Sequence, residues 1–341
     1  MEIKIGNYKI GTKHPIFIIA EIGATHGGNL NQALKLIKAA KASGANAVKL
    51  QTVSPDYSYT KDSLSYRIFK KLSFSLEDLK KIKAEAIRNK LLIFSTPGDF
   101  PSVDLVQKLN FPIIKISSGL MTNTPLIKAI AKLKKPVFIS SGMAYLDELA
   151  KSIRILKSNG IKRILAFHCT SEYPCKSKNV NLKAIQFLHQ TLKLPIGFSD
   201  HTRDILASTL SVSHGAVAVE KHLALSDSLA GPERGVACNP HEFSQMVNQI
   251  REAEKMLGDG NKNPSKSEML GRRVNRRTLF SIKKIKKGDK FSKTNLGLMR
   301  GNIRKGLGMS PDEYENIIKF YASQDIPENA PIKISMIGKL P

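Results

Sequence analysis

Eight short runs rich in β-branched and other apolar residues recur along most of the chain, and nearly every run precedes a longer segment with the spacing of an amphipathic helix. The runs cover residues 16–23, 47–51, 91–96, 113–117, 137–141, 163–170, 195–201 and 216–222. The helical segments cover residues 30–43, 75–89, 125–133, 146–158, 182–191, 204–213 and 240–257. Strands that alternate with helices in this way are typical of βα units, whose strands form one parallel sheet.

The number of units favours a closed barrel over an open sheet. A (β/α)8 barrel, or TIM barrel, takes about 250 residues, which agrees with eight units in this length of chain. A doubly wound open sheet usually has fewer strands and a glycine-rich turn after the first one. The first turn here, EIGATHGG, lacks the G-x-G-x-x-G spacing of such a turn. We therefore expect an α/β protein built on a TIM barrel.

The end of the chain differs from the rest and predicts a second, smaller domain. We assign residues 1–262 to the barrel and residues 263–279 to a linker, because the stretch 260–277 is polar and basic. Residues 280–296 and 321–337 are loosely similar, each with a short strand, a turn-forming centre and a second short strand. Residues 280–341 are therefore expected to form a small β-rich domain.

Polar residues lie at or just past the end of every predicted strand. Because a TIM barrel places the carboxyl ends of its strands around one mouth, these side chains are expected to form a ring there. The ring would contain Glu21, Lys49, Gln51, Thr96, Lys115, Ser118, Ser140, Ser141, His168, Thr170, Ser199, His201, Glu220 and His222. One polar strand end is usually a surface residue, but repetition on every strand indicates an active site.

Within this ring, cationic and hydroxyl side chains predict an anion-binding site. Lys49 and Lys115 would each point into the mouth. Hydroxyl groups from four further strand ends add donors for phosphate oxygens, namely Thr96, Ser118, Ser140 and Ser199. A single strand serine or threonine is ordinarily explained by local structure. Two lysines and four hydroxyls on different strands are better explained as a cradle for phosphate and carboxylate.

Two histidines predict a metal site at the same mouth. His201 and His222 end the seventh and eighth predicted strands, which are neighbours in a barrel. Two neutral imidazoles from adjacent strand ends can hold a divalent cation, with water and substrate oxygens in the open positions. Glu21 would face the same space from the first strand, where it could bind a metal water or a sugar hydroxyl.

The charge of the chain bears on its partners. The formal net charge is +26, with 54 Lys and Arg against 28 Asp and Glu, which suits an anionic partner or simply a lysine-rich solvated surface. Most lysines, such as Lys80, Lys81 and Lys83, lie in predicted helices away from the mouth. We therefore expect a small, multiply anionic substrate and regard nucleic acid as unlikely.

The location is expected to be cytoplasmic. No run approaches the ~20 apolar residues of a membrane helix, so we expect no membrane association. The N-terminus also lacks the apolar core and cleavage site of an export signal. The three cysteines are an odd number in a long chain, which favours reduced thiols over a disulfide framework.

At these residues the chain resembles the sialic acid synthases. AEIGATHGG, VKLQT, FSTP, IKISSG, ISSGM, HCTSEYP, GFSDHT, VEKH and AGPE occur in the order found in that family. The family condenses phosphoenolpyruvate with N-acetylmannosamine-like sugars to give nine-carbon keto acids such as N-acetylneuraminic, legionaminic and pseudaminic acids. The resemblance covers nearly the whole chain, because RRTLFSIKKIKKGDKFSKTNL resembles the C-terminal antifreeze-like (SAF) domain of the family.

The resemblance implies roles for individual residues. Manganese or magnesium on His201 and His222 would polarise the sugar aldehyde and orient the attacking water. Glu21, Gln51, Tyr173 and Glu233 would face the sugar or the metal water. The residues implied to contact phosphoenolpyruvate are Lys49, Thr96, Lys115, Ser118, Ser140, Ser171 and Ser199. In the family the SAF domain covers the mouth of the partner subunit and donates an arginine that Arg300 matches, which implies a domain-swapped homodimer.

Several positions depart from the family pattern and keep other interpretations open. Thr25 and Ser171 replace asparagines, and Glu233 replaces an aspartate. Leu120 stands where the family usually has a glutamate with a role in substrate contact and proton handling, and leucine can do neither. One hypothesis is that Glu172 supplies a compensating carboxylate.

Two rival functions follow from these departures. The first is condensation of phosphoenolpyruvate with a phosphorylated aldose, although enzymes of that kind lack a SAF-like appendage. The second is a paralogue that has lost catalysis and binds sugar or nucleic acid, for which Leu120 is the best support. Release of phosphate from phosphoenolpyruvate with a panel of N-acylated hexosamines would distinguish them.

Overall fold

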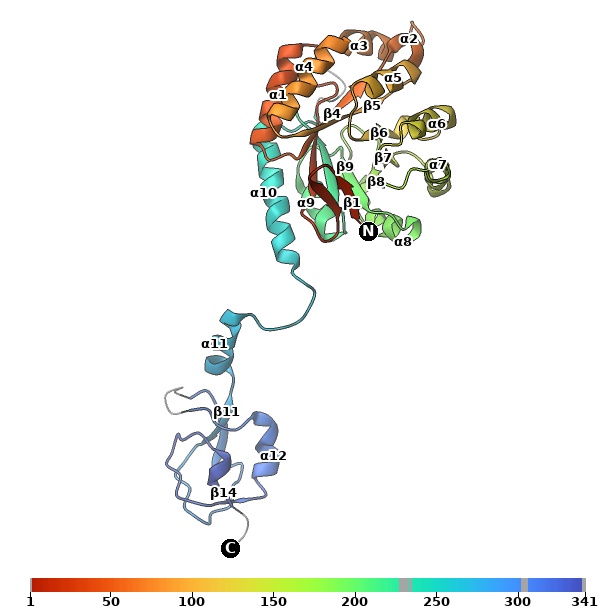
Figure 1. Ribbon diagram of the computed structural model, residues 1–341. Helices are drawn as coiled ribbons and strands as arrows, with labels where there is room; N and C mark the ends of the chain where they lie inside the picture. Colours follow the sequence, from red (N-terminus) through yellow and green to blue (C-terminus); the bar gives the residue numbers. More distant parts are fainter. Residues whose placement is uncertain (1, 227–232, 234, 302–305, 339–341) are drawn as a thin grey trace. The chain divides into compact units, whose positions relative to one another are not determined.

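The computed structural model describes residues 2–226, 233, 235–301 and 306–338, and the chain divides into two compact units, Met1–Gly258 and Asp259–Pro341 (Figure 1). The first unit contains a closed barrel of parallel strands in the order β10-β3-β4-β5-β6-β7-β8-β9. All eight predicted strands are confirmed. They are β3 (Phe17–Glu21), β4 (Ala47–Thr52), β5 (Leu92–Pro97), β6 (Ile114–Ile116), β7 (Val137–Ser140), β8 (Ile164–Cys169), β9 (Ile196–Asp200) and β10 (Ala218–His222).

Helices follow every barrel strand and surround the sheet (Figure 1). The structure confirms the seven predicted helices and adds α2, α3 and α5. Their bounds are α1 (Leu30–Ala42), α2 (Pro55–Ser58), α3 (Leu64–Leu72), α4 (Leu76–Arg88), α5 (Phe100–Lys108), α6 (Thr124–Lys132), α7 (Leu146–Ser158), α8 (Lys183–Leu192), α9 (Leu206–Ser213) and α10 (Pro240–Leu257). Among the described residues, no helix is long and apolar enough to cross a membrane.

Local chemistry explains where these helices begin and which face they bury. In α1 the Asn29 side chain accepts a hydrogen bond from the Gln32 backbone N–H, which satisfies a donor that the first turn leaves free. The buried face of α1 consists of Ala33, Leu36, Ile37 and Ala40, spaced three and four residues apart. In α5 the Asp99 side chain caps Ser102, and Pro101 lies in the first turn, where a missing N–H has no cost.

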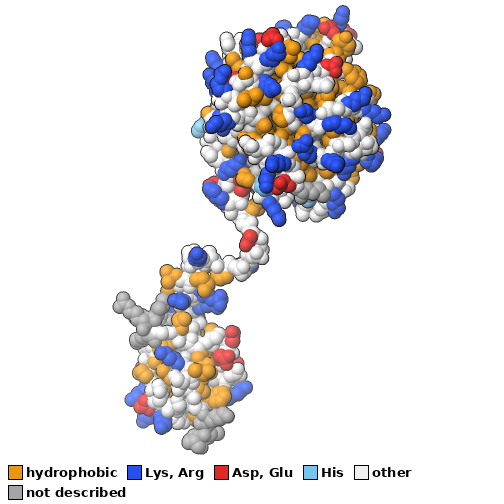
Figure 2. All heavy atoms as spheres, in the orientation of Figure 1, with side chains coloured by type: hydrophobic (Ala, Val, Ile, Leu, Met, Phe, Trp, Pro, Cys, Tyr) orange, Lys and Arg blue, Asp and Glu red, His pale blue; other side chains and the backbone are white. Residues whose placement is uncertain are grey.

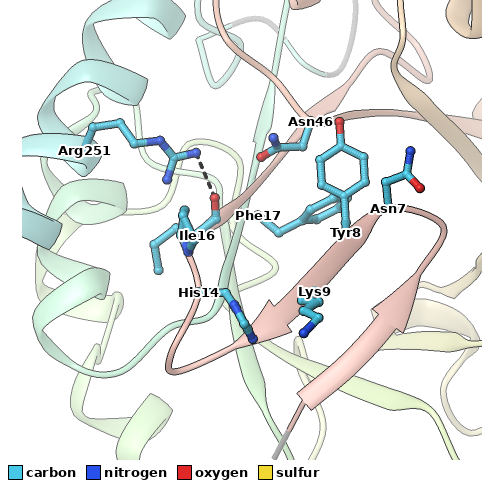
Figure 3. Close-up of a pocket in the computed structure, with 9 residues that line it drawn as sticks. Asn7, Tyr8, Lys9, His14, Ile16, Phe17, Asn46 and Arg251 are labelled. Atoms are coloured by element: carbon cyan, nitrogen blue, oxygen red, sulfur yellow. Dashed lines mark hydrogen bonds between the residues drawn. The ribbon is translucent and has the colours of Figure 1, made fainter.

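A hairpin that the sequence did not predict closes the bottom of the barrel. Strands β1 (Glu2–Ile5) and β2 (Tyr8–Gly11) pair antiparallel before the barrel begins. Ile3, Ile5 and Ile10 are buried in one cluster with side chains from the barrel interior. The Tyr8 ring packs edge-on against Phe17 with ring centroids 5.3 Å apart (Figure 3). The hairpin therefore covers the end of the barrel opposite the mouth.

The alternation of side chains along each strand determines what lies inside the barrel. Towards the bottom the interior is filled with aromatic residues, and Phe94, Phe138 and Phe167 pack with ring centroids 5.6 to 5.7 Å apart. Gly197 leaves room for Phe167, because a Cβ there would lie 2.5 Å from the ring. Two residues further along most strands, the inward side chains become polar. The aromatic layer thus fills the barrel interior beneath the polar mouth.

The second unit is small and contains two similar halves. Strand β11 (Thr278–Ser281) pairs antiparallel with β12 (Leu296–Met299), and β13 (Tyr321–Ala322) pairs with β14 (Ile337–Gly338), in agreement with the predicted repeat. Its core includes Leu279, Ile285, Phe291 and Ile326. Helix α12 (Tyr314–Ile317) lies between the halves in the sequence, and α11 (Lys266–Asn275) falls inside the segment expected to be a linker.

Candidate active site

A cavity of about 710 Å³ opens at the carboxyl ends of the barrel strands. The barrel residues implied to contact phosphoenolpyruvate, the sugar or the metal all line it: Glu21, Lys49, Gln51, Thr96, Lys115, Ser118, Ser140, Ser171, Tyr173, Ser199, His201, His222 and Glu233. Of the predicted ring, Ser141, His168 and Thr170 do not line the cavity. His168 faces away from it, and its Nε2 contacts the Val180 carbonyl 2.7 Å away.

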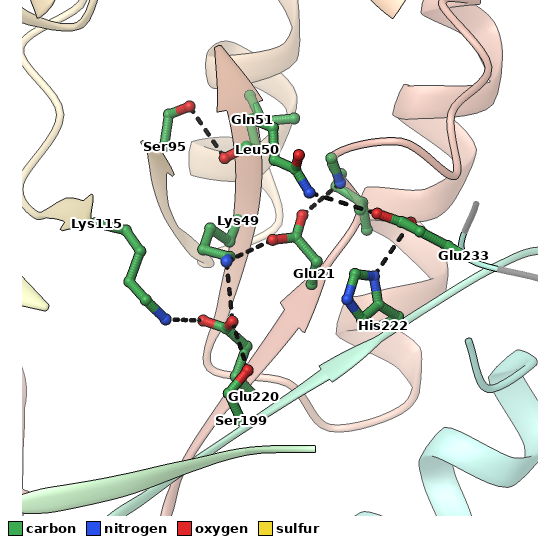
Figure 4. Close-up of polar contacts among 12 residues, drawn as sticks. Glu21, Lys49, Leu50, Gln51, Ser95, Lys115, Ser199, Glu220, His222 and Glu233 are labelled. Atoms are coloured by element: carbon green, nitrogen blue, oxygen red, sulfur yellow. Dashed lines mark hydrogen bonds and ion pairs between the residues drawn. The ribbon is translucent and has the colours of Figure 1, made fainter. Parts of the chain in front are cut away.

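Two buried lysines form the floor of the cavity and share one carboxylate, as Figure 4 shows. Lys49 Nζ lies 2.9 Å from Glu220 Oε1, and Lys115 Nζ lies 2.8 Å from Glu220 Oε2. Lys49 also lies 2.6 Å from Glu21 Oε2, and Ser199 Oγ donates to Glu220 Oε1 over 3.0 Å. Glu220 therefore links the cations into one network.

The environment of the two lysines differs, which affects their protonation. Burial opposes the charge of Lys49, but the carboxylates of Glu21 and Glu220 outweigh burial and raise its pKa. Burial lowers the pKa of Lys115, and Glu220 only partly offsets this effect. Lys115 Nζ also lies 4.1 Å from the centre of the Phe167 ring, a favourable contact for a cation. A bound anion would favour the charged form of both lysines.

Hydroxyl groups stand around this cationic floor. Within the described part of the chain, the buried Thr96 hydroxyl has no hydrogen-bond partner, which suits a site for a ligand oxygen. Ser118 Oγ contacts Cys169 Sγ at 3.2 Å. Gly142, with φ 48°, follows β7 and passes so close that a Cβ would lie 2.1 Å from the Ser118 side chain. The turn after β7 thus brings its backbone directly against Ser118.

His201 is held as a neutral imidazole whose Nε2 lone pair faces the Tyr173 hydroxyl. Its Nδ1 lies 2.8 Å from the Thr170 carbonyl, which only accepts hydrogen bonds, so Nδ1 carries the proton. Nε2 is then an acceptor, and the Tyr173 hydroxyl donates to it over 3.1 Å. Burial, together with His222, lowers the pKa of His201 to about 4. Burial raises the pKa of Tyr173, so this hydroxyl stays protonated.

His222 lies beside His201 and is paired with a carboxylate. The two ring centroids are 5.6 Å apart, and His222 Nδ1 lies 3.1 Å from Glu233 Oε2. Burial opposes the charge of His222, but the Glu233 carboxylate outweighs it and raises the pKa of this histidine. Gln51 Nε2 donates to the other Glu233 oxygen over 3.4 Å. A polar cluster thus surrounds the two imidazoles.

The two histidines fit a divalent metal as an incomplete ligand pair. In the described residues, no group of three or more His, Cys, Asp or Glu side chains is arranged to hold a metal ion. The lone pair on His201 Nε2 and the neighbouring His222 ring match the nitrogen ligands that manganese and similar cations accept. With two protein ligands, water and substrate oxygens would complete the coordination sphere.

The cavity also has an apolar part. Val53, Tyr59, Phe69, Leu120 and Met143 line it together with the polar groups described above. Leu120 ends the short 3-10 turn Ser118–Leu120 after β6 and packs partly against the barrel core. At this position the cavity therefore offers a hydrocarbon surface, with no carboxylate.

The structure corrects the hypothesis about Glu172 and adds Glu220. Glu172 is not among the residues that line the cavity, and its Oε2 accepts hydrogen bonds from Asn179 Nδ2 at 2.9 Å and from the Lys176 N–H at 3.3 Å. Its own loop thus occupies this carboxylate. Glu220 was expected only in the polar ring, yet it joins both lysines. The sequence alone could have indicated this position in the site, since Glu220 lies two residues before His222 and therefore shares its face of β10.

Arg300 is the one predicted site residue outside the barrel unit. It is exposed and directly follows β12 in the second unit. The AGPE motif is only partly described, because residues 230–232 lie outside the described residues and only Glu233 of the motif is included. The contribution of Arg300 to a barrel mouth remains a prediction.

Fold and site together define a class of protein, a TIM barrel with a cationic, hydroxyl-rich mouth that carries two histidines. A profile of the NeuB family matches residues 36–262. The chain is 38% identical to the N,N'-diacetyllegionaminic acid synthase of Campylobacter jejuni, over 93% of this chain and 98% of the relative. It is 40% identical to an uncharacterized protein of Methanocaldococcus jannaschii, over 88% and 89% of the two chains.

A solved structure agrees with these sequence matches. The N-acetylneuraminic acid synthetase of Leptospira borgpetersenii, in complex with citrate, superposes with a TM-score of 0.75 at 33% identity, covering 81% of this chain and 97% of that one. The chain therefore belongs to the NeuB family, the family of the sialic and other nonulosonic acid synthases.

Proposed function

We propose that this protein condenses phosphoenolpyruvate with the open-chain form of an N-acylated, mannosamine-like amino sugar. C3 of phosphoenolpyruvate would form a bond to the aldehyde carbon, whose oxygen takes up a proton. Water would add at C2, and the C–O bond to phosphate would break. The products are inorganic phosphate and a nine-carbon 2-keto acid. The observation that carries this proposal is the convergence of Lys49, Lys115, five serine and threonine hydroxyls and three glutamate carboxylates on one cavity.

Phosphoenolpyruvate is proposed to bind over the cationic floor. Its phosphate and carboxylate carry the charges that Lys49 and Lys115 would neutralise. The hydroxyl groups proposed to surround it are those of Thr96, Ser118, Ser140, Ser171 and Ser199. The unpaired Thr96 hydroxyl supports this assignment, since a buried hydroxyl without a partner is costly unless a ligand supplies one.

The sugar is proposed to lie beside the two histidines. His201 and His222 would hold manganese or magnesium, which when bound supplies a Lewis acid for the aldehyde oxygen. Glu21 and Glu233 present carboxylate oxygens as hydrogen-bond acceptors for sugar hydroxyls or bound water. The Gln51 amide and the Tyr173 hydroxyl would orient the sugar, and Tyr173 keeps its proton at neutral pH because burial raises its pKa.

The second unit and the subunit arrangement are part of the same proposal. We propose that residues 280–341 form a SAF domain that covers the barrel mouth of a partner subunit in a domain-swapped homodimer. Arg300 would then add a cation to the substrates at that mouth. The reaction is proposed to take place in the cytoplasm, which the three free cysteine thiols support.

The direct test is a phosphate-release assay with manganese, phosphoenolpyruvate and a panel of N-acylated hexosamines, followed by the mass of the product. We expect release only when an acceptor sugar is present, and a product mass equal to the sugar plus pyruvate. The control is phosphoenolpyruvate without a sugar. Release with a phosphorylated aldose alone would favour the first rival function, and no release with any sugar would favour a binding paralogue.

Leu120 is proposed to influence which acceptor is preferred. A leucine side chain cannot bond a sugar hydroxyl, so the acceptor group near it should be apolar, such as a methyl or acyl group. We expect Leu120→Glu to shift kcat/KM towards more hydroxylated acceptors of the panel. Leu120→Met is the matched control because it keeps an apolar surface of similar size. An unchanged order of acceptors in Leu120→Glu would contradict this role.

A further inference from the structure

One buried ion pair lies behind the site and makes no contact with the cavity. Asp200 and Lys221 are each 0% exposed, and Lys221 Nζ lies 3.2 Å from Asp200 Oδ2. They face each other in the register of β9 and β10. Because side chains alternate along a strand, Lys221 points away from the cavity that Glu220 and His222 line. The pair thus sits between the sheet and its helices.

Lys221 holds the loop that begins with His201. Its ammonium group donates to the Thr202 carbonyl over 2.6 Å and to the Asp204 carbonyl over 2.8 Å. With Asp200 as the third partner, all three N–H donors of the ammonium have an acceptor. Thr202 directly follows His201, so these bonds restrain the backbone on the carboxyl side of that histidine.

Asp200 restrains the same loop from the other side. Its Oδ1 accepts from the Thr202 N–H over 2.8 Å, and its Oδ2 accepts from Ser208 Oγ over 2.6 Å. Ser208 lies in the first turn of α9 and is 0% exposed. The carboxylate therefore ties the end of β9 to α9, and His201 lies in the segment between them.

We propose that Asp200 and Lys221 are positioning residues that fix His201 relative to His222. Lys221 precedes His222 on β10, and Asp200 precedes His201 on β9, so the pair joins the backbones of both histidines. The ring of His201 is oriented separately by its bond to the Thr170 carbonyl. Mutation of a group that orients a metal ligand typically lowers the metal affinity about 10- to 100-fold. This inference rests on the proposed function, because it takes the two histidines as metal ligands.

The test measures binding of Mn²⁺ alone to the full chain by isothermal titration, with thermal unfolding and steady-state kinetics on the same samples. Lys221→Met removes the ammonium, and Ser208→Ala removes one bond to Asp200 without touching the charges. The matched control is Lys83→Met, since Lys83 also donates to a loop carbonyl, that of Leu109 at 2.7 Å, but outside the cavity.

We expect Mn²⁺ to bind about 10- to 100-fold more weakly to Lys221→Met, a few-fold more weakly to Ser208→Ala, and equally well to Lys83→Met. In Lys221→Met and in Ser208→Ala, kcat should fall. KM for phosphoenolpyruvate should change less than about threefold, because the lysines of the cavity floor are intact. If Lys221→Met does not fold, Ser208→Ala against Lys83→Met decides the question.

Unchanged Mn²⁺ affinity in Ser208→Ala and Lys221→Met would overturn the inference. Equal weakening in Lys83→Met would also overturn it, because the effect would then be general destabilisation. Failure of the proposed function gives a different result. In that case the wild-type protein binds Mn²⁺ but releases no phosphate with any sugar, and the ratio of Mn²⁺ affinities still reports on positioning.

Discussion

Glu220 gives the floor of the cavity its particular chemistry. Its two oxygens bond to Lys49 and Lys115, so neither cation is left unpaired in the buried site. A buried cation without a partner would cost several kcal/mol, so the carboxylate offsets part of this cost for both lysines and holds them in place before an anion arrives. A phosphate or carboxylate that binds here replaces or shares a partner that already exists.

Lys115→Met should therefore reduce the affinity for phosphoenolpyruvate while the fold is retained, since Glu220 keeps its contact with Lys49. Loss of a charge-assisted contact to an anion should lower kcat/KM for phosphoenolpyruvate about 100-fold, equivalent to about 3 kcal/mol. Steady-state kinetics at several phosphoenolpyruvate concentrations measure this. Lys135→Met is the control, because Lys135 donates to the exposed Asn110 side chain and does not line the cavity. Equal kinetics of the two variants would contradict the assignment.

His26 is a buried histidine that affects stability. It is 2% exposed, its Nδ1 accepts from the Gly28 N–H over 3.0 Å, and its ring packs against Phe74 with centroids 4.5 Å apart. Burial lowers the pKa of His26 to about 4. Protonation would remove the acceptor that Gly28 uses and would bury a charge.

This lowered pKa predicts a pH dependence of unfolding. Between about pH 6.5 and pH 4 the unfolded chain binds a proton at His26 that the folded chain does not, so the free energy of unfolding falls as the pH falls. The loss from His26 is at most about 3 kcal/mol. In His26→Asn, whose Oδ1 also accepts from an N–H, the loss over this window should be smaller by that amount. Denaturant unfolding at pH 7 and pH 4.5 measures the loss in each protein. Equal losses in the wild type and in His26→Asn would contradict the prediction.

A single barrel strand contributes residues to the apolar core, to the cavity and to the contact with the helices. On β10, Ala218 lies in the aromatic layer, Glu220 and His222 line the cavity, and Val219 and Lys221 face the helices. The interior therefore changes from apolar to polar within one strand. The hairpin of β1 and β2 completes the apolar half, since it seals the bottom of the barrel with isoleucines.

Ile10→Ala tests the contribution of the hairpin. Ile10 is 0% exposed and packs with the barrel interior, so its truncation should lower the free energy of unfolding of the barrel unit by about 2 to 4 kcal/mol. Ile87→Ala is the matched control, because Ile87 is 60% exposed on α4 and should change that free energy by less than about 0.5 kcal/mol. A loss in Ile10→Ala no larger than in the control would mean that the hairpin only covers the surface.

At the scale of the whole molecule, the distribution of basic side chains indicates which kind of partner the protein can bind. The Lys and Arg side chains are scattered over the visible face of the barrel unit in Figure 2 and do not gather in one patch. The scatter on this face agrees with a solvated surface, and the buried lysines of the floor are placed to meet an anion.

The proposed domain swap predicts complementation between two inactive variants. His201→Ala removes a barrel ligand, and Arg300→Ala removes the arginine that the second unit would donate. If Arg300 acts on the partner's barrel, a mixed dimer contains one complete site, and statistical mixing should restore about a quarter of the wild-type activity. The phosphate-release assay on co-expressed variants measures this. Activity no higher than the sum of the separate variants would contradict donation in trans.

The sequence by itself determined the barrel, its eight strands and the polar strand ends from which the mouth is built, because strand-helix alternation and polar strand ends are local patterns. It did not reveal the hairpin at the bottom, whose strands are short and are stabilised by contacts with distant barrel residues. It also left open which polar strand ends face inward. Only the tertiary structure decided that Glu220 joins the two lysines, that His168 and Glu172 turn away, and that Asp200 and Lys221 pair behind the histidines. These outcomes depend on the direction of side chains in the closed sheet and on contacts between strands far apart in the chain, which spacing along the sequence does not contain.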